Sequence, residues 1–367
     1  MNRRDALKLA FAGAASFAMP KLMASSGAGL ASTLFSASEN NIGQYQLSLF
    51  TLATNEARHF ALPFRAHDIL PLPSTNQVLA FGRRPQMQCV LVNTDGSGTA
   101  KEMNATEGRH FFGHGCLNTD NSVLFTTESE YDEARGVIGL RDANTLQPIG
   151  EYESYGMGPH DIHLMPDGKT LVVANGGIET HPDYGRRKLN IETMQPSLVY
   201  IDVASGKKID EYRLDDHQLS IRHIAVSPTG GVGVATQFQG DLSKRQPNSL
   251  VAWQQNGGNL VNLQMPKALI ESLKGYIADI AYNDINQQLV VTAPRGNQVL
   301  LWDLQHQSAV KTFNLSEPSG ISVYDNSFVI SNTKGALMTL DPKHPISGFN
   351  EHYKDSNINW DNHLTIS

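Results

Sequence analysis

Cysteine is scarce in this sequence, which has only Cys89 and Cys116 among 367 residues. Neither belongs to a paired Cys-x-x-Cys pattern, which excludes a cysteine-based zinc site and a haem-attachment motif. Both lie in apolar, strand-like runs, "MQCVLV" and "GHGCLNTD". We therefore expect two buried free thiols, although an oxidising compartment would permit a disulfide.

The chain also lacks a basic run and a long apolar run. Its formal net charge of −7 argues against nucleic acid or an anionic membrane surface as the main partner. No segment is long and apolar enough to span a bilayer. Nucleophile-elbow, Walker and dinucleotide-binding motifs are absent too. What remains is a globular composition, 40% hydrophobic with 31 glycines and 17 prolines.

The N-terminus has the order of parts expected of an export signal. An arginine pair at positions 3 and 4 precedes a weakly apolar run over residues 9–20, and small residues follow it. This order resembles a twin-arginine signal, which predicts a periplasmic mature protein. The alternative is an N-terminal helix that carries two arginines by chance. We assign residues 1–31 to the signal and a flexible start.

One short stretch recurs along the rest of the chain. With "GPHDIHLMPDG" as template, similar stretches begin at residues 65, 112, 220 and 276, and weaker copies lie at 317 and at the C-terminus. Equivalent residues are separated by 41 to 62 residues. Blades of four strands repeat every 40–50 residues or so, and insertions explain the two longest gaps.

Each copy is followed by further strand-like segments, except the last, where the chain ends at Ser367. Strands before the first copy, at about Gln44–Phe64, have no inner strand of their own. The sequence therefore predicts an all-β, seven-bladed propeller over residues 44–367. The N-terminal strands are expected to close it by pairing with the C-terminal strand at Asp361–Ile366.

Two aligned columns of the repeat are rich in histidine. The first column is His67, His114, His160, Arg222, Ala278, Ser319 and Asn362, and the second is Asp68, Gly115, Asp161, His223, Asp279, Gly320 and His363. Inner strands of a propeller surround a channel, so these side chains should meet at one mouth of it. Imidazole beside carboxylate suits a divalent metal, iron or copper before others.

We predict His67, His114 and His160 as metal ligands. Further ligand-binding residues are predicted around the same mouth, partly from the long insertion after Asn175: Asp68, Asp161, His181, Arg186, Arg222, His223 and Arg295. The alternative for each polar residue on an inner strand is a hydrogen bond that ties neighbouring blades without any ligand. A guanidinium such as Arg222 beside a metal requires an anion or carboxylate between them, or no metal at all.

The motifs "GHG", "GPHDIHLMPDG", "LSIRH" and "TAPRGN", together with the arginine pair, resemble an uncharacterised bacterial family of exported seven-bladed propellers. Members are commonly encoded beside imelysin-type iron-uptake proteins. The resemblance implies a periplasmic role in iron acquisition, with iron-uptake proteins as partners. It maps the strongest motifs of the family onto His114, His160, His181, Arg186, Arg222 and His223.

Three functions follow for the chain. A binding protein for a metal or a small anionic metal chelate ranks first, because clustered imidazoles serve no purpose in a scaffold. A protein-interaction scaffold ranks second. A metal-dependent hydrolase or oxidoreductase ranks third, since it also requires an open metal position and a general base.

Overall fold

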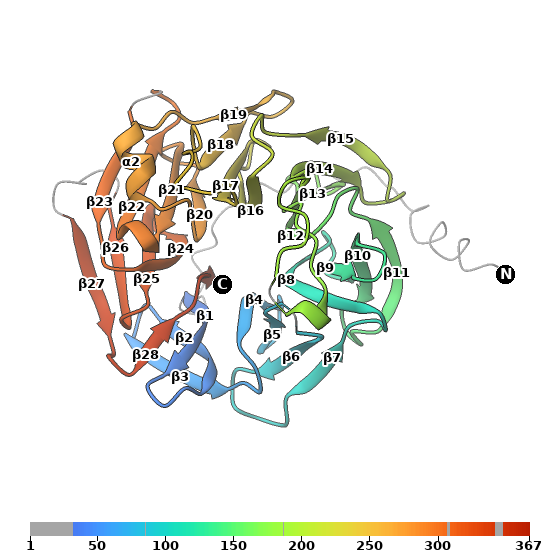
Figure 1. Cartoon of the computed structure of the whole chain (residues 1–367). Helices are drawn as coiled ribbons and strands as arrows, with labels where there is room; N and C mark the ends of the chain where they lie inside the picture. Colours follow the sequence, from blue (N-terminus) through green and yellow to red (C-terminus); the bar gives the residue numbers. More distant parts are fainter. Residues whose placement is uncertain (1–31, 85, 186, 307–308, 342–347) are drawn as a thin grey trace, which may run out of the picture. The chain divides into compact units, whose positions relative to one another are not determined.

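Seven β-sheets of this chain stand in a ring around a central channel, as predicted (Figure 1). The computed structural model describes residues 32–84, 86–185, 187–306, 309–341 and 348–367. The predicted signal at 1–31 and the predicted ligand-binding residue Arg186 lie outside these ranges. In the described part of the chain, six sheets are four-stranded antiparallel meanders and the seventh closes the ring.

Each four-stranded blade runs from an inner strand at the channel to an outer strand at the rim (Figure 1). The first three are β4 (Ala66–Pro71), β5 (Gln77–Gly82), β6 (Gln88–Asn93) and β7 (Lys101–Asn104); β8 (Arg109–Leu117), β9 (Val123–Glu130), β10 (Arg135–Asp142) and β11 (Pro148–Glu153); and β12 (Pro159–Leu164), β13 (Thr170–Asn175), β14 (Ser197–Asp202) and β15 (Lys208–Tyr212). The next three are β16 (Leu219–Val226), β17 (Val232–Phe238), β18 (Val251–Gln254) and β19 (Leu260–Asn262); β20 (Asp279–Asn283), β21 (Gln288–Ala293), β22 (Gln298–Asp303) and β23 (Lys311–Asn314); and β24 (Pro318–Tyr324), β25 (Ser327–Asn332), β26 (Ala336–Leu340) and β27 (Phe349–Lys354).

Apolar side chains fill the spaces between blades. Seven buried clusters occur among the described residues, and each joins two adjacent blades. Middle strands such as "TLVVAN" in β13 are therefore apolar on both faces rather than alternating. Burying both faces of every sheet holds the ring together and fixes the positions of the inner strands.

Both ends of the chain build the closing blade. Its strands are β1 (Thr33–Asn40), β2 (Tyr45–Thr51) and β3 (Glu56–Ala61) from the N-terminal side, with β28 (Ile358–Trp360) and β29 (Thr365–Ile366) on the channel side. The predicted closure is confirmed, but its partner strand is different. β1 pairs with β28 and β29, whereas the expected Gln44–Phe64 segment supplies only the two outer strands.

The missed strand β1 reads "TLFSASEN", whose small polar residues continue the composition of the segment before it. Two of its serines are buried and hydrogen-bonded. The Ser36 hydroxyl donates to the carbonyl of His363 at 2.6 Å, and Ser38 pairs with Ser48 at 2.6 Å. Tertiary contacts therefore turn a linker-like sequence into a central strand.

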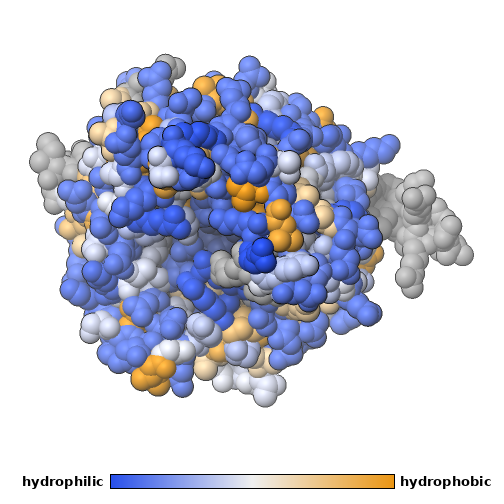
Figure 2. All heavy atoms as spheres, viewed as in Figure 1, coloured by the Kyte–Doolittle hydropathy of each residue, from blue (hydrophilic) through white to orange (hydrophobic). Residues whose placement is uncertain are grey.

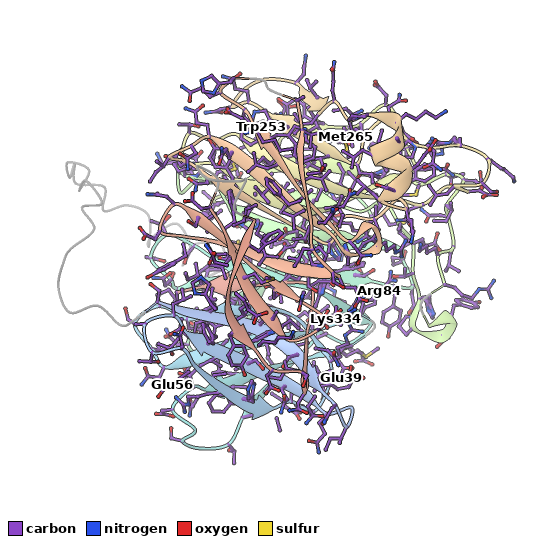
Figure 3. All side chains as sticks on the ribbon, turned by 90° about the vertical axis from the view of Figure 1, so that its left-hand side faces the viewer. Glu39, Glu56, Arg84, Trp253, Met265 and Lys334 are labelled. Carbon is purple, nitrogen blue, oxygen red and sulfur yellow. The ribbon has the colours of Figure 1, made fainter. Side chains whose placement is uncertain are left out.

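Two insertions explain the long gaps in the repeat. One lies between β13 and β14 and contains η1 (Pro182–Tyr184); the other follows β17, and α2 (Lys267–Ser272) lies after β19. A further single turn, η2 (Pro294–Gly296), follows β21. Seen from the side, η1 projects from one face, towards which Arg84 also lies, while Glu56 lies towards the other face (Figure 3). Within the described ranges, no helix is long and apolar enough to cross a membrane.

Candidate metal centre in the channel

Irregular pairing of the inner strands directs the first-column side chains into the channel. In five inner strands the register against the second strand shifts at the site residues: Ala66/Ile69, Phe111/Gly115, Pro159/Asp161, Ile221/His223 and Pro318/Ile321. A β-bulge places two residues opposite one and turns a side chain away from the regular alternation. The bulges are therefore what brings His67, His114 and His160 to the axis.

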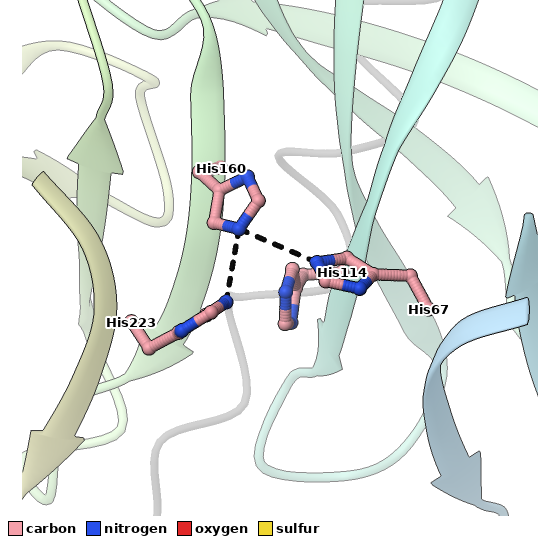
Figure 4. A group of neighbouring side chains, drawn as sticks. All are labelled: His67, His114, His160 and His223. Carbon is pink, nitrogen blue, oxygen red and sulfur yellow. Dashed lines mark hydrogen bonds between the residues drawn. The ribbon is translucent and has the colours of Figure 1, made fainter. Parts of the chain in front are cut away.

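Four buried imidazoles meet at this level of the channel (Figure 4). His67, His114, His160 and His223 each offer a ring nitrogen, and these nitrogens lie within 4.8 Å of one another. The Nε2 atom of His160 lies 3.3 Å from Nε2 of His67 and 2.9 Å from Nε2 of His223. We call these four residues the histidine cluster.

His363 is a fifth imidazole beside the histidine cluster. It follows β28 in the closing blade, and its ring centroid lies 4.3 Å from that of His223 and 4.7 Å from that of His67. Its position was in the second repeat column, but we did not include it among the predicted ligands. The repeat alignment was the signal that could have identified it.

Two glycines make room for the imidazoles. A Cβ atom on Gly113, which has φ of 112°, would lie 2.6 Å from the ring of His67. At Gly320 a Cβ would lie 2.5 Å from the backbone of His363. The glycine before His114 in "GHG" is therefore needed for the neighbouring ring and for its own backbone conformation.

Carboxylates stand behind two of the imidazoles. Nδ1 of His114 lies 3.3 Å from Asp68 and 3.5 Å from Asp161, while Nδ1 of His363 lies 3.2 Å from Asp279. A neutral imidazole in these surroundings carries its proton on Nδ1 and leaves a lone pair on Nε2. In both rings Nε2 is buried without a hydrogen-bond partner in the described part of the chain.

His160 has the opposite environment. The Arg222 guanidinium nitrogen Nη1 lies 3.3 Å from Nδ1 of His160. Because a guanidinium only donates hydrogen bonds, Nδ1 of His160 is the acceptor and the ring proton lies on Nε2. The facing Nε2 atoms of His67 and His223 therefore present lone pairs towards it.

The surroundings set the charge of each ring. Burial, reinforced by neighbouring cations and imidazoles, lowers the pKa values of His67, His160 and His223 well below 6.5, so all three are neutral at pH 7. Burial opposes protonation of His363, but the charge and hydrogen bond of Asp279 outweigh it and raise the pKa of His363 to about 9. His363 is thus a cation in the metal-free protein.

Asp161 and Asp279 also tie neighbouring blades. Asp161 Oδ2 accepts a hydrogen bond from the backbone N–H of Ile224 in the next blade at 2.9 Å. Asp279 Oδ2 does the same with Ile321 at 2.9 Å. Burial works against ionisation of Asp161, yet the nearby His163 and His114 hold the pKa of this carboxyl far below its usual range. Both carboxylates therefore make the hydrogen bond between blades that the alternative interpretation expects.

A cavity of about 240 Å³ adjoins the histidine cluster along the channel. His114, His363 and the three aspartates of the second column line it. His163 also lines it, with Nε2 3.4 Å from Asp161. Ionisable groups of both signs therefore share this lining with apolar side chains such as Ile162 and Ile224.

The remaining predicted residues lie apart from the cluster. Nε2 of His181 is 3.1 Å from Asp132, and its ring packs on Tyr131, so the inserted segment leans on the turn between β9 and β10. The Arg295 guanidinium lies 4.3 Å from the ring centroid of Tyr276. Neither side chain has a described contact with an imidazole of the histidine cluster. Cys89 and Cys116 are free thiols; Cys89 is buried, while Cys116 is partly exposed.

Fold and site together define a seven-bladed β-propeller with a buried imidazole cluster in its channel. The chain belongs to DUF1513, a family of proteins of unknown function, whose model matches residues 60–367. Among curated proteins there is no match.

Solved structures resemble the chain in fold alone. A chain of hydrazine synthase from Kuenenia stuttgartiensis is 13% identical, with 85% of this chain and 90% of that chain covered and a TM-score of 0.60. A chain of a nidogen/laminin complex is 12% identical, with 91% and 98% covered and a TM-score of 0.48. At these identities the likeness is one of architecture.

Proposed function

We propose that this propeller binds a divalent transition-metal ion, iron or copper, at the histidine cluster. One observation carries the proposal: Nε2 of His114, the lone-pair atom of the neutral ring when a carboxylate stands behind Nδ1, is buried without a hydrogen-bond partner among the described residues. A buried polar atom without a partner costs about 1–3 kcal/mol. A purely structural ring would be expected to satisfy this nitrogen, whereas a metal ligand keeps the lone pair for its ion.

The spacing of the nitrogens supports the same conclusion. Two nitrogens bound at roughly 2.0–2.1 Å to one ion lie about 2.9 Å apart at a right angle and about 3.4 Å apart in a tetrahedron. The separations from His160 Nε2, 2.9 and 3.3 Å, match these values. The four rings offer ligand nitrogens that all lie within 4.8 Å of one another.

Charge and hydrogen bonding favour binding as well. A ligating imidazole must be neutral, and burial keeps three of the four rings in that form. The carboxylates behind His114 hold its proton on Nδ1, the arrangement that orients imidazole ligands in metal sites. His114 is therefore the strongest single ligand candidate.

Titration of the purified full-length chain with Fe²⁺ under anaerobic conditions, and with Cu²⁺ and Zn²⁺, tests the proposal. We expect one ion per chain in calorimetry, with loss of binding in His114→Ala. His352→Ala is the matched control, because this exposed histidine lies on the outer strand β27, where its ring bonds to Thr339. An unchanged isotherm for His114→Ala, with an intact circular dichroism spectrum, would sink the proposal.

We place this activity in the periplasm as part of iron acquisition. The twin-arginine pattern at residues 3–4 supports the periplasmic location. The resemblance to propellers encoded beside imelysin-type proteins supports iron-uptake proteins as partners. Arg3→Lys combined with Arg4→Lys should retain the precursor in the cytoplasm, as cell fractionation would detect. Normal periplasmic accumulation of the double variant would contradict the twin-arginine export route. This outcome has no bearing on the proposed metal site.

A further inference from the structure

The imidazoles of the channel differ in what stands behind Nδ1. His114 and His363 each have a carboxylate there, which leaves the lone pair of the neutral His114 ring on Nε2. His160 has the Arg222 guanidinium at 3.3 Å instead, which holds its proton on Nε2. His160 therefore faces the centre of the cluster with an N–H group, which no metal ion can bind.

A ligating His160 would need its proton on Nδ1. That proton would then point at a guanidinium that also only donates, so the present contact cannot survive metal binding through Nε2. The positive charge of Arg222 adds repulsion towards an incoming cation. An anion between Arg222 and His160 removes both conflicts, because its oxygens accept from the guanidinium and from Nδ1–H together.

We propose that Arg222 makes the histidine cluster a joint site for a metal ion and a small oxyanion, a carboxylate or carbonate. This inference rests on the proposed metal site and names its co-ligand. The anion supplies for His160 the oxygen acceptor that Asp68 and Asp161 supply for His114. The proton moves within the His160 ring, from Nε2 to Nδ1, so no net proton is gained or lost in this step.

The position of Arg222 suits such a ligand. Arg222 and His160 are each 9% exposed, compared with 4% for His114 and 2% for His223. The face of the ring shown in Figure 2 has a hydrophilic hollow at its centre. Three aspartates of the second column already face His114 and His363, whereas the ring nitrogens of His160 contact Arg222, His67 and His223.

Equilibrium titration with Zn²⁺ as a redox-inert probe tests the dependence. Free Zn²⁺ is set with a competing chromophoric chelator, in chloride alone and with added bicarbonate, acetate or citrate. In the wild type we expect each effective oxyanion to increase the affinity for Zn²⁺ by about 10- to 100-fold. This is the usual effect on metal affinity of a hydrogen-bond partner behind an imidazole ligand. The arms with bicarbonate, acetate and citrate distinguish carbonate from simple and chelating carboxylates.

Two substitutions at Arg222 separate the roles of charge and acceptor. Arg222→Met should bind Zn²⁺ more tightly than the wild type in chloride and lose the oxyanion effect. Arg222→Glu should bind tightly without any added anion, since it places a carboxylate near His160. Arg213→Gln is the matched control, because Arg213 pairs with Glu211 at the rim of the ring.

The outcomes separate the two proposals. If wild type and both Arg222 variants bind Zn²⁺ equally, with no effect of oxyanions, while His114→Ala does not bind, the metal site stands and the joint site is wrong. If no form binds under any condition, both are wrong. Equilibrium dialysis with labelled bicarbonate gives a test without variants: one carbonate retained per zinc supports the joint site, and none retained with any metal load refutes the carbonate form.

Discussion

The two halves of the ring share the blade architecture and differ in their side chains at the axis. At the first column, β4, β8, β12 and β16 carry His67, His114, His160 and Arg222, whereas the other three positions are Ala278, Ser319 and Asn362. Bulged pairing occurs in both halves, in β12 and again in β24. An aspartate ties adjacent blades in both halves too, Asp161 in one and Asp279 in the other.

This difference separates architecture from chemistry. The half with Ala278 and Ser319 shows that a blade packs and closes with small side chains at the axis. The imidazoles of the other half are therefore not required by the fold, and they carry buried nitrogens without partners. Buried nitrogens without partners destabilise the protein, so the side chains that carry them are candidates for a functional role.

The strongest way to break the comparison is to remove the closing strands, which belong to the small-residue half. Deleting residues 359–367 takes away the buried Trp360 and Leu364 and leaves β1 without its inner partners. We expect a loss comparable with the whole stability of a domain, roughly 5–15 kcal/mol. Guanidinium denaturation followed by circular dichroism measures it, and an unchanged midpoint would contradict the closure argument.

The halves should respond to opposite pH extremes. In the histidine half the pKa values of His67, His160 and His223 are lowered by burial, so the unfolded chain binds more protons below about pH 6.5 and stability falls as pH falls. In the other half the pKa of His363 is raised to about 9. Its contribution is complete below about pH 6.5 and is lost as pH rises through 9.

By linkage the alkaline loss is on the order of 3 kcal/mol. Denaturation curves at pH 5, 7 and 9.5 measure both arms, with His223→Asn expected to reduce the acid loss and His363→Asn the alkaline loss. Flat stability between pH 5 and 7 would show that the buried rings are not held neutral.

The two tethers sharpen the comparison further. Asp161→Asn and Asp279→Asn each weaken one buried hydrogen bond to the next blade and should cost about 1–3 kcal/mol in unfolding free energy. Of these two aspartates, Asp161 is the one that faces His114, so Asp161→Asn should also weaken metal binding, by about 10- to 100-fold. Equal losses of affinity in both variants would mean that the carboxylates act through general stability alone.

The smallest expected effect comes from making one half look like the other. His67→Ser gives β4 the side chain that β24 has at Ser319. The lost packing and the removal of a buried nitrogen without a partner offset each other, so we expect a change within about 1 kcal/mol in the metal-free protein. Thermal unfolding without metal measures it; a large destabilisation would mean that the imidazole is structural.

The fold was predictable because the repeat keeps its turn chemistry and its apolar middle strands. The seven inner strands and the closure from both ends follow from this pattern. β1 was missed because Ser36, Ala37 and Ser38 resemble a linker until their contacts are known. The segment is a strand because its side chains are buried in the ring, since its own residues have little intrinsic preference for that structure.

The candidate site was predictable in part. The repeat alignment correctly groups the three first-column histidines, since equivalent positions in a ring lie at the same height. His223 belongs to the second column and joins them where the pairing of β16 shifts its register. Repeat spacing does not predict where the side chains of His181 and Arg295 lie, because both residues follow the regular strands and their positions depend on local contacts with Asp132 and Tyr276. The contact between Arg222 and His160 depends on side-chain conformation in a bulged strand, which no sequence period encodes.

The closing blade has a consequence for how the protein is made. Its inner strands, β28 and β29, follow the strands of the six four-stranded blades in the chain, and His363 lies between them. During synthesis those six blades emerge before the ring can close, and the fifth imidazole joins the channel only with the closing blade. A chain cut short before residue 358 therefore lacks both the closure and His363, so any binding in the channel depends on a closed ring.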